Sequence, residues 1–540
     1  AQRDHGAAHP SHPRRRTRAP GGPPMTGRED FFSDAGRHAR TDPPAPTVAR
    51  ARARFQPARV AAIVAVLAVT IGAGVVDRVA HRAVAPPPPA LAVTAVPSAA
   101  VESSAWYCAG GTSAPGSTAA TTIQLVNTTA APVDGTLSAV SDTGTTKSEP
   151  VVVPARAQSV VVPGPLVGGK VVAATVELDG GGVLVTESVA GPLGWSEAPC
   201  SRSTAPEWYF ASGSTVDGGT MAISLYNPTT TDAVVDMTFV TPSGISQPTP
   251  FEGIVVPPGT VAVEQVDSQV QDDASVSSIV VARTGAVVAA MLQTESVNGA
   301  HGVSLRLGAP TLSGHWTLPD SIDLTNGTTA ITVFNPVGRP DRVTVTVHPG
   351  ASPVATFTHL VGPRTAWVLE TSGEGRIPAG VPFLATVRAS GPGVVVDRSI
   401  SAPRSFSAPQ FGAVTGLSSG PPQPLSAVAV LPGPGTRAHP STADAVVEGL
   451  SIVNPGAASV RASVLAMGVG GLVPLGSVTV RPGRAEVFGR SGPGAAALRR
   501  VGRVPLVVRA GAPVGVLEDL GPSAAAAVVG IAGAGSGPVG

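Results

Sequence analysis

The sequence predicts an all-β protein: four tandem Ig-like β-sandwich units that follow one N-terminal transmembrane helix. Three observations predict this fold class. Val and Ala supply most of the apolar residues and stand between 64 Gly and 55 Pro, which favours strands joined by turns. One set of landmarks recurs four times after residue 105, as expected of a repeat architecture. An uncharged apolar run near the N-terminus has the length of a membrane span.

Length and composition limit the organisation of the chain. Its 540 residues correspond to three or four domains at about 150 residues each. Hydrophobic residues make up 43% and the mean hydropathy is +0.24, so most of the chain is too apolar to be disordered. No long stretch beyond residue 80 places apolar residues at helical spacing, and we therefore expect β-structure there.

Residues 1–59 are the most basic segment of the chain. They contain twelve Arg and five acidic residues, a net charge of +7, which leaves −6 for the rest of a chain whose total is +1. The segment is rich in Pro, Arg and Ala without periodicity, which predicts a disordered cytoplasmic tail. Its Arg residues stand among Pro rather than aromatic residues. We therefore expect them to signal membrane topology, and we expect no nucleic-acid partner.

Residues 60–76 are predicted to be a transmembrane helix. These 17 residues carry no charge, and at 1.5 Å per residue they just cross a hydrocarbon core of about 30 Å. Four Arg between positions 50 and 59 precede the run, so the positive-inside rule places the N-terminus in the cytoplasm and the bulk of the chain outside. An uncleaved signal anchor is favoured over a cleaved signal peptide. Residues 77–105 form a Pro-rich stalk.

Two landmarks define the repeated unit. An apolar strand ends in Asn, and a Pro follows 27, 30, 28 and 28 residues later in the successive units. The Asn residues are Asn127, Asn227, Asn335 and Asn454, and the Pro residues are Pro154, Pro257, Pro363 and Pro482. We predict that each Asn caps a turn at the strand exit rather than binding a ligand. The units occupy residues 106–200, 201–300, 301–415 and 416–520, and a low-complexity tail follows at 521–540.

Turns complete each unit. Gly-containing turns such as residues 142–144 and 242–244 predict a hairpin in the middle of a unit, and turns such as 179–182 and 283–285 predict another near its end. Six or seven short strands result, which is the size of a sandwich domain. The alternative architecture is a closed, propeller-like arrangement of four pseudo-repeats, in which residues 524–533 would be a closing strand.

The opening of the unit resembles a known type of repeat. Residues 208–215 read Trp-Tyr-Phe-Ala-Ser-Gly-Ser-Thr, and an Asn-Pro pair and a Val-Pro-Pro-Gly turn follow at 227–228 and 256–259. These features are similar to the Trp-Tyr-Phe-Ala-Glu-Gly type β repeats of secreted bacterial surface proteins, with Ser212 where Glu is common. Together with the anchor, they resemble an uncharacterised actinobacterial family of membrane-anchored secreted proteins of unknown function. The resemblance implies no catalytic residue and places such proteins near cell-wall glycan assembly genes.

Cys108 and Cys200 are the only cysteines, and both lie on the predicted outer side of the membrane. Two cysteines outside the cytosol favour a disulfide over free thiols. Cys108 stands in the opening strand of the first unit and Cys200 just after its last strand, so a bond would join the two ends of one domain. We predict the Cys108–Cys200 disulfide.

The sequence contains no zinc-binding motif and no well-supported catalytic motif. Its ten His are scattered or lie in the basic tail, without His-Glu-x-x-His spacing, and Ser-x-x-Lys is missing. Gly-x-Ser-x-Gly occurs once, at residues 416–420, but no helical spacing of apolar residues follows it, as a nucleophile elbow requires. We therefore predict no enzyme and no catalytic, metal or cofactor residue. Glu187, Asp397 and Glu518 end the outgoing strands of three units. We interpret them as solvated strand ends, with a carboxylate cluster between units as the alternative.

Trp106, Trp208 and Trp316 open the first three units and are the candidate contacts for a partner or glycan. An exposed Trp at a domain edge can stack on a sugar ring or fill a pocket of a partner. A Trp that faces inward instead closes its own β-core or seals a junction between units, which is the interpretation we favour. Only the solvent exposure of these side chains separates the two roles.

These observations predict a membrane-anchored extracytoplasmic protein of the bacterial cell envelope. Its expected role is a non-catalytic scaffold or binding module, with cell-wall glycan or another envelope protein as partner. The alternative is an accessory protein or cryptic enzyme of cell-wall glycan assembly, with a site between β units. That alternative requires Glu187, Asp397, Glu518 and a His to meet in one place.

Overall fold

The computed structural model describes residues 94–532 apart from internal gaps. The gaps are residues 115–116, 217, 298–299, 323–327, 351–352, 372, 379–381, 403–409, 416, 419–425, 432–448, 469, 490–492, 502–503, 520–527 and 530. The described residues belong to one compact unit, Pro86–Gly540. The predicted basic tail and the predicted membrane helix at 60–76 lie outside them. Among the described residues, no helix has the length and apolar character to cross a membrane.

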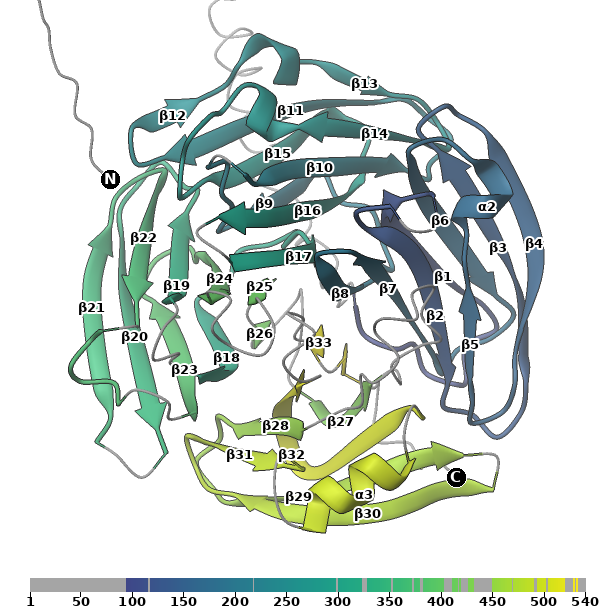
Figure 1. The fold of residues 1–540 in the computed structure, drawn as a ribbon, viewed down its shortest axis with the longest axis vertical. Helices are drawn as coiled ribbons and strands as arrows, with labels where there is room; N and C mark the ends of the chain where they lie inside the picture. Colours follow the sequence, from purple (N-terminus) through teal and green to yellow (C-terminus); the bar gives the residue numbers. More distant parts are fainter. Residues whose placement is uncertain are drawn as a thin grey trace, which may run out of the picture. The chain divides into compact units, whose positions relative to one another are not determined.

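The four predicted units are called repeats 1 to 4 from here on. Repeat 1 contains strands β1 to β8 (Figure 1). They are β1 Ser104–Thr112, β2 Ala120–Asn127, β3 Val133–Ser141, β4 Thr146–Val153, β5 Gln158–Val161, β6 Val171–Leu178, β7 Val183–Gly191 and β8 Gly194–Pro199, with the short helix α2 Gly164–Val167. Pairing runs β4-β3-β6-β1-β2-β7-β8, and β5 joins β2. A parallel contact of Thr112 with Ala120 is the link between β1 and β2. The halves β4-β3-β6-β1 and β5-β2-β7-β8 are otherwise separate sheets.

Repeat 2 forms two sheets. Its elements are β9 Glu207–Phe210, β10 Thr220–Asn227, β11 Ala233–Thr241, β12 Gly244–Ser246, η1 Thr249–Phe251, β13 Ile254–Val256, β14 Thr260–Gln265, η2 Val266–Ser268, β15 Ser277–Thr284, β16 Val288–Val297 and β17 Ala300–Leu307. One sheet has the order β14-β10-β16-β17, and the other has the order β12-β11-β15-β9 with β13 beside β11. Because β17 pairs with β16 over its full length, repeat 2 continues to Leu307.

Repeat 3 repeats this plan. Its strands are β18 His315–Ile322, β19 Thr328–Asn335, β20 Asp341–Pro349, β21 Ala355–Val361, β22 Thr365–Glu370, β23 Pro382–Ala389, β24 Val395–Ala402, β25 Gln410–Thr415 and β26 Leu417–Ser418. The sheets run β22-β19-β24-β25 and β21-β20-β23-β18-β26. Thus β21 and β22 are the terminal strands of the two sheets, on the side away from β25 and β26.

Repeat 4 varies the plan in two ways. Its elements are β27 Ser426–Leu431, β28 Gly449–Asn454, β29 Val460–Gly468, β30 Gly471–Val480, β31 Arg484–Phe488, α3 Pro493–Val501, β32 Leu506–Asp519, β33 Val528–Val529 and β34 Ile531–Ala532. The long strand β32 pairs first with β27 and β29 and then with β28 and β33, so it passes from one sheet to the other. The helix α3 was not predicted, because its apolar face consists of little more than Ala495 and Leu498.

Strand pairing confirms an all-β fold but corrects the late hairpins. The turns at 142–144 and 242–244 do join paired strands, β3 with β4 and β11 with β12. The turns at 179–182 and 283–285 do not: β6 and β7 lie in different halves, and β15 and β16 lie in different sheets. The same turn residues serve both connections, since a Gly with positive φ reverses the chain whether or not the flanking strands pair.

The strand order also differs from that of a constant-type immunoglobulin sandwich. There the first strand joins the sheet of the second strand, and the last strand joins the sheet of the third and sixth. In repeat 2 the first strand, β9, pairs with β15, while β16 pairs with β10. The pairs β10 with β14 and β11 with β15 keep the usual arrangement. The first and last strands have therefore exchanged sheets.

Apolar clusters of the described residues cross three boundaries between repeats, those of repeats 1 and 2, 2 and 3, and 4 and 1. Ala109 and Val189 of repeat 1 belong to the core of repeat 2, and Tyr209 and Ala309 of repeat 2 belong to that of repeat 3. Repeat 4 in turn contributes Val430, Met467 and Val507 to the core of repeat 1. Strand contacts follow the same order: β8 with β17, β17 with β25, β18 with β32, and β33 with β8. The contacts between repeats therefore close on themselves, as the alternative architecture expected.

Candidate functional site: the strand exits and the junctions between repeats

The four Asn residues at the strand exits make the same contacts. In repeat 2, the Asn227 amide nitrogen donates to the Thr231 and Val256 carbonyl oxygens at 2.8 Å each, and its oxygen accepts from the Thr229 N–H at 3.0 Å. Asn127, Asn335 and Asn454 repeat this pattern, and all four residues are fully buried. Each Asn therefore joins its own turn to a neighbouring strand, which confirms the predicted structural role.

Trp106, Trp208 and Trp316 are 0%, 0% and 1% exposed. The indole N–H of Trp208 donates to the Val287 carbonyl at 2.8 Å, and that of Trp316 donates to the Val394 carbonyl at 2.9 Å. Side chains buried to this extent present no surface to a sugar or a partner protein. The assignment of the three Trp as candidate contacts is therefore corrected. A Trp on the opening strand faces the space between the two sheets, and burying a large ring there stabilises the repeat.

The predicted disulfide between Cys108 and Cys200 is present, and the two cysteines are 92 positions apart in the sequence. Both cysteines are 1% exposed. Next to them, Tyr107 and Ser201 exchange two backbone hydrogen bonds of 2.7 and 2.9 Å. The bond therefore fastens the end of repeat 1 to its opening strand.

Repeat 2 has an aromatic contact at the position where repeat 1 has its disulfide. Phe210 and Gly308 occupy the places of Cys108 and Cys200, since Tyr209 and Ala309 exchange the corresponding pair of backbone hydrogen bonds. A Cβ atom on Gly308 would lie 2.9 Å from the Phe210 ring. The ring packs directly on the glycine, and a packed aromatic ring closes repeat 2 where a covalent bond closes repeat 1.

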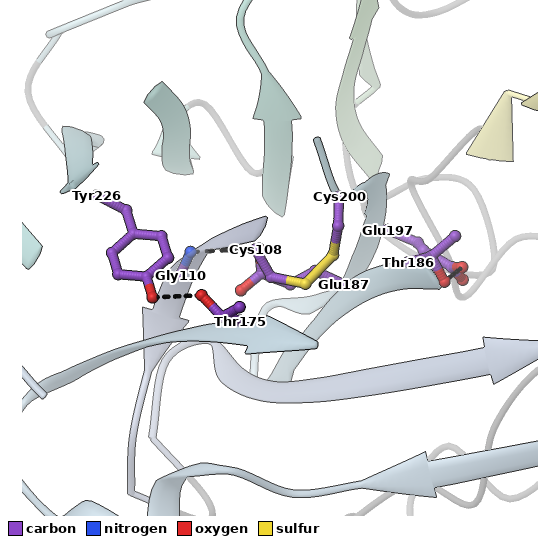
Figure 2. The surroundings of a disulfide bond; sticks show 8 residues. All are labelled: Cys108, Gly110, Thr175, Thr186, Glu187, Glu197, Cys200 and Tyr226. Carbon is purple, nitrogen blue, oxygen red and sulfur yellow. Dashed lines mark hydrogen bonds between the residues drawn. A yellow bond between two sulfur atoms is a disulfide. The ribbon is translucent and has the colours of Figure 1, made fainter. Parts of the chain in front are cut away.

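Glu187 lies beside the disulfide (Figure 2). Its side chain is buried; one oxygen accepts from the Gly110 N–H at 3.2 Å, and the other has no hydrogen-bond partner. Burial raises the pKa of Glu187 to about 7, and the single Gly110 hydrogen bond lowers it only in part. Gly110 has φ of 113°, and a Cβ there would lie 2.4 Å from the Val172 carbonyl oxygen, so only glycine fits.

Arg306 and Asp397 form a buried ion pair across the junction of repeats 2 and 3. The Arg306 Nη1 lies 2.9 Å from the Asp397 Oδ2, and the two side chains are 2% and 0% exposed. The same carboxylate oxygen accepts from the Ala211 and Ser212 N–H groups at 3.0 and 2.9 Å. The guanidinium also donates to the Ser212 hydroxyl and carbonyl oxygens at 2.7 and 2.9 Å. Ser212, at the position where the similar repeats have Glu, is thus a partner to both charges.

Polar contacts also join repeats 1 and 2. The Tyr226 hydroxyl lies 2.6 Å from the Thr175 hydroxyl, and burial raises the pKa of Tyr226 to about 12 (Figure 2). The Leu305 N–H of β17 donates to the Ser196 hydroxyl of β8 at 2.9 Å. Buried polar groups with good partners fix the register of a contact, whereas apolar packing alone tolerates sliding. Both junctions therefore have a defined geometry.

Glu187 and Asp397 are 3% and 0% exposed, so they are not the solvated strand ends that the sequence predicted, and the structure does not bring these two carboxylates together. Glu187 pairs with Ile123, four positions before Asn127, whereas Asp397 pairs with Thr332, three positions before Asn335. Neighbouring positions on a strand face opposite ways. Glu187 accordingly points to Gly110 of its own repeat, and Asp397 points to Ser212 of another. The side chain of Glu518 lies outside the described residues, as do those of His301 and His439.

Within the described ranges, no group of three His, Cys, Asp or Glu side chains is arranged to hold a metal ion. The junction residue that sequence reasoning missed is Arg306. A single Arg in a strand predicts a solvent-exposed side chain. No nearby residue indicated that its partner, Asp397, belongs to the next repeat. The buried polar arrangement of Arg306, Ser212 and Asp397 holds two repeats together.

Part of the chain is similar to a family of unknown function. Residues 183–368, from β7 to β22, match the family described as "Family of unknown function (DUF5719)". No curated protein matches the chain. The "Crystal Structure of Thermotoga maritima 1070" is similar over 20% of this chain and 94% of that chain, at 16% identity and a TM-score of 0.18.

A second solved structure is similar over more of the sequence. The "Crystal structure of tetra-tandem repeat in extending region of large adhesion protein" covers 76% of this chain and 97% of that chain, at 13% identity and a TM-score of 0.11. At these TM-scores neither likeness bears on fold or function.

Proposed function

We propose that this protein is a membrane-anchored, extracytoplasmic, non-catalytic scaffold of the bacterial cell envelope. The observation that carries the proposal is the buried Cys108–Cys200 bond. Disulfides persist in oxidising compartments and are rare in the reducing cytosol. The proposed anchor is the helix predicted at residues 60–76, which leaves the repeats outside the membrane.

The junctions between repeats support a scaffold role. The Arg306–Asp397 pair and the shared apolar clusters resist separation of neighbouring repeats. A body joined in this way presents its surface in a fixed geometry, which suits a protein that positions an envelope protein or cell-wall glycan. The repeats themselves are proposed to be Ig-like sandwiches whose first and last strands have exchanged sheets.

The redox state of the cysteines in cells tests the proposal. Cells that express the full chain are quenched with acid, which stops thiol–disulfide exchange. The denatured protein is then treated with a maleimide that slows its migration on a gel. We expect no adduct without reductant and two adducts after reduction. The Cys108→Ser variant, which leaves Cys200 unpaired, should give one adduct without reductant and shows that the labelling works. Two adducts on the unreduced native sequence would contradict an extracytoplasmic location.

Anchoring is tested separately. Deletion of residues 60–76 should move the protein from the membrane fraction to the soluble fraction. A protein that stays in the membrane fraction without this segment would contradict the proposed anchor.

A further inference from the structure

Repeat 3 carries an aromatic pair on its surface. His359 of β21 and Trp367 of β22 stack with their ring centroids 5.0 Å apart and an interplanar angle of 24°. β21 and β22 end the two sheets of this repeat, so the pair spans the open side between the sheets. His359 is exposed and Trp367 is half-buried. Trp367 also packs against the core of repeat 3.

The other repeats have different residues at these two positions. The position of His359, opposite Val343, holds Val151, Ile254 and Val478 in repeats 1, 2 and 4. The position of Trp367, opposite Val333, holds Ser159, Ala262 and Glu486. The fold therefore forms without an aromatic residue at either position, and core packing does not account for the pair.

Charged groups stand at one end of the pair. Phe357 lies two residues before His359 on β21, which places it on the same face at about 7 Å. The Arg376 guanidinium lies over the Phe357 ring, 3.9 Å from its centroid, and bonds with Glu374 at 3.0 Å. The Arg376 side chain is 56% exposed and that of Glu374 is 26% exposed. Phe357 itself is buried, and it connects the aromatic pair to a donor and acceptor pair that solvent reaches.

We propose that His359, Trp367, Arg376 and Glu374 form a carbohydrate-binding site for the pyranose rings of an oligosaccharide. A pyranose ring has apolar C–H faces and a rim of hydroxyl groups. Aromatic rings cover such a face, while a guanidinium donates to hydroxyl oxygens and a carboxylate accepts from hydroxyl hydrogens. Because one face of each ring is used in the stack, the sugar meets the outer face of His359 and the open edge of Trp367. Since Trp367 is held by the core, the stack is in place before the ligand arrives, which lowers the entropy cost of binding.

The surface around the pair suits a sugar better than a protein. Leu360 and Val368 are exposed, at 55% and 38%, but each follows a member of the pair directly in its strand. Successive strand residues face opposite ways, so these two side chains do not extend the aromatic surface. The remaining surface is one aromatic pair beside charged groups, much smaller than the roughly 800 Å² that each partner buries in a stable protein interface.

Binding of defined oligosaccharides tests the proposal. The full chain, in a detergent without a sugar headgroup, is titrated calorimetrically with chitotetraose, mannotetraose and a galactose tetrasaccharide. We expect at least one of them to bind. The chitotetraose arm distinguishes N-acetylated amino sugars from the neutral hexoses of the other two arms.

Substitutions locate the site. Trp367→Ala introduces the residue that repeat 2 has at this position, and we expect binding about tenfold weaker or more. His359→Val introduces the residue of repeats 1 and 4 and should also weaken binding. Val255→Thr changes an exposed apolar residue of repeat 2, which is 58% exposed, and should leave the affinity unchanged. His359→Val and Val255→Thr should keep unfolding midpoints close to that of the native protein. The Trp367→Ala midpoint should fall, because its ring packs against the core, but the protein should still be folded at the temperature of the titration.

Absence of binding to all three oligosaccharides would overturn the proposal, as would native affinity in Trp367→Ala. The site rests on the proposed function only in that an extracytoplasmic protein meets polysaccharide. The two can fail independently: a disulfide found in cells together with no sugar binding would reject the site and keep the scaffold.

Discussion

At the scale of single residues, one buried amide serves at least three backbone groups at each strand exit. Asn227 donates to two backbone carbonyls and accepts from one backbone N–H, and no other side chain of that size offers both functions in one plane. The Asp side chain has the same shape but lacks the two donors. Asn at this position is therefore a requirement of the turn.

Asn227→Asp should destabilise the protein. Two buried carbonyl groups, those of Thr231 and Val256, would lose their donor, at about 1–3 kcal/mol each in unfolding free energy. Urea titration followed by circular dichroism measures the change. Ser243→Ala, in an exposed turn of the same repeat, should stay within about 0.5 kcal/mol of the native protein. Equal stability of the two variants would contradict the structural role of the Asn.

Glu187 predicts a pH dependence of stability. Its pKa is about 7 in the folded protein against 4.5 ordinarily, so the folded state holds the proton between these values while the unfolded state releases it. The free energy of unfolding should therefore fall as pH rises from about 4.5 to 7, by about 3 kcal/mol.

Glu187→Gln isolates this effect, since the amide oxygen still accepts from the Gly110 N–H. The difference in unfolding free energy between Glu187→Gln and the native protein should grow over this pH range. Burial, and to a smaller extent Arg484, lower the pKa of His348, which makes the free energy of unfolding rise with pH. This contribution is the same in both proteins and cancels in the difference. A difference independent of pH would show that Glu187 is ionised throughout.

Residues with short-range roles could be predicted from the sequence, and residues with long-range roles could not. The Asn positions were found because each acts on a turn within a few residues, and the cysteines because only one pairing exists. Arg306 gave no signal, since its partners Ser212 and Asp397 lie in other strands and one belongs to another repeat. His359 and Trp367 are recognised as exceptions only when equivalent positions of the four repeats are compared. That comparison needs the register of β21 on β20 and of β22 on β19.

At the scale of elements, the junction of repeats 2 and 3 depends on a charge pair inside the protein. Removing one partner of a buried pair leaves the other charge uncompensated, at a cost of about 3–5 kcal/mol. Arg306→Met and Asp397→Leu should each lower the unfolding free energy by this amount, as chemical denaturation would measure.

The double variant Arg306→Met with Asp397→Leu should cost clearly less than the two single changes added together, because no unpaired charge remains. Additive costs would mean that the two side chains do not depend on each other. Arg283→Met, at an exposed pair with Asp236, is the matched control and should change little.

Strand positions were predicted better than strand partners. The Gly-containing turn at 283–285 was expected to make a hairpin, but β15 and β16 enter different sheets. A turn reports only that the chain reverses, whereas pairing depends on which apolar faces meet afterwards. The same limit applies to β9 and β16. The alternation of apolar residues along a strand does not depend on which sheet the strand joins, so their exchange of sheets could not be predicted.

At the scale of the whole molecule, the last repeat contributes to the core of the first. Met467 is 2% exposed and belongs to the apolar cluster that contains Trp106 and both cysteines. Met467→Ala should therefore raise amide hydrogen exchange in β1 and β2 as well as in β29, because a cavity loosens both sides of the contact.

Val473→Ala supplies the control for this measurement, since Val473 of neighbouring β30 is 55% exposed. Its effect should be confined to β30. If Met467→Ala changes exchange only within repeat 4, then the first and last repeats do not stabilise each other.

The central claim is that the repeats lie outside the membrane and residues 1–59 lie inside, and cysteine labelling in intact cells tests it most directly. Ser148→Cys adds a thiol on an exposed part of repeat 1, and Ser33→Cys adds one in the basic tail. With a membrane-impermeant maleimide, the Ser148→Cys protein should be labelled in intact cells, and the Ser33→Cys protein only after lysis. Labelling of the Ser33→Cys protein alone in intact cells would contradict the account.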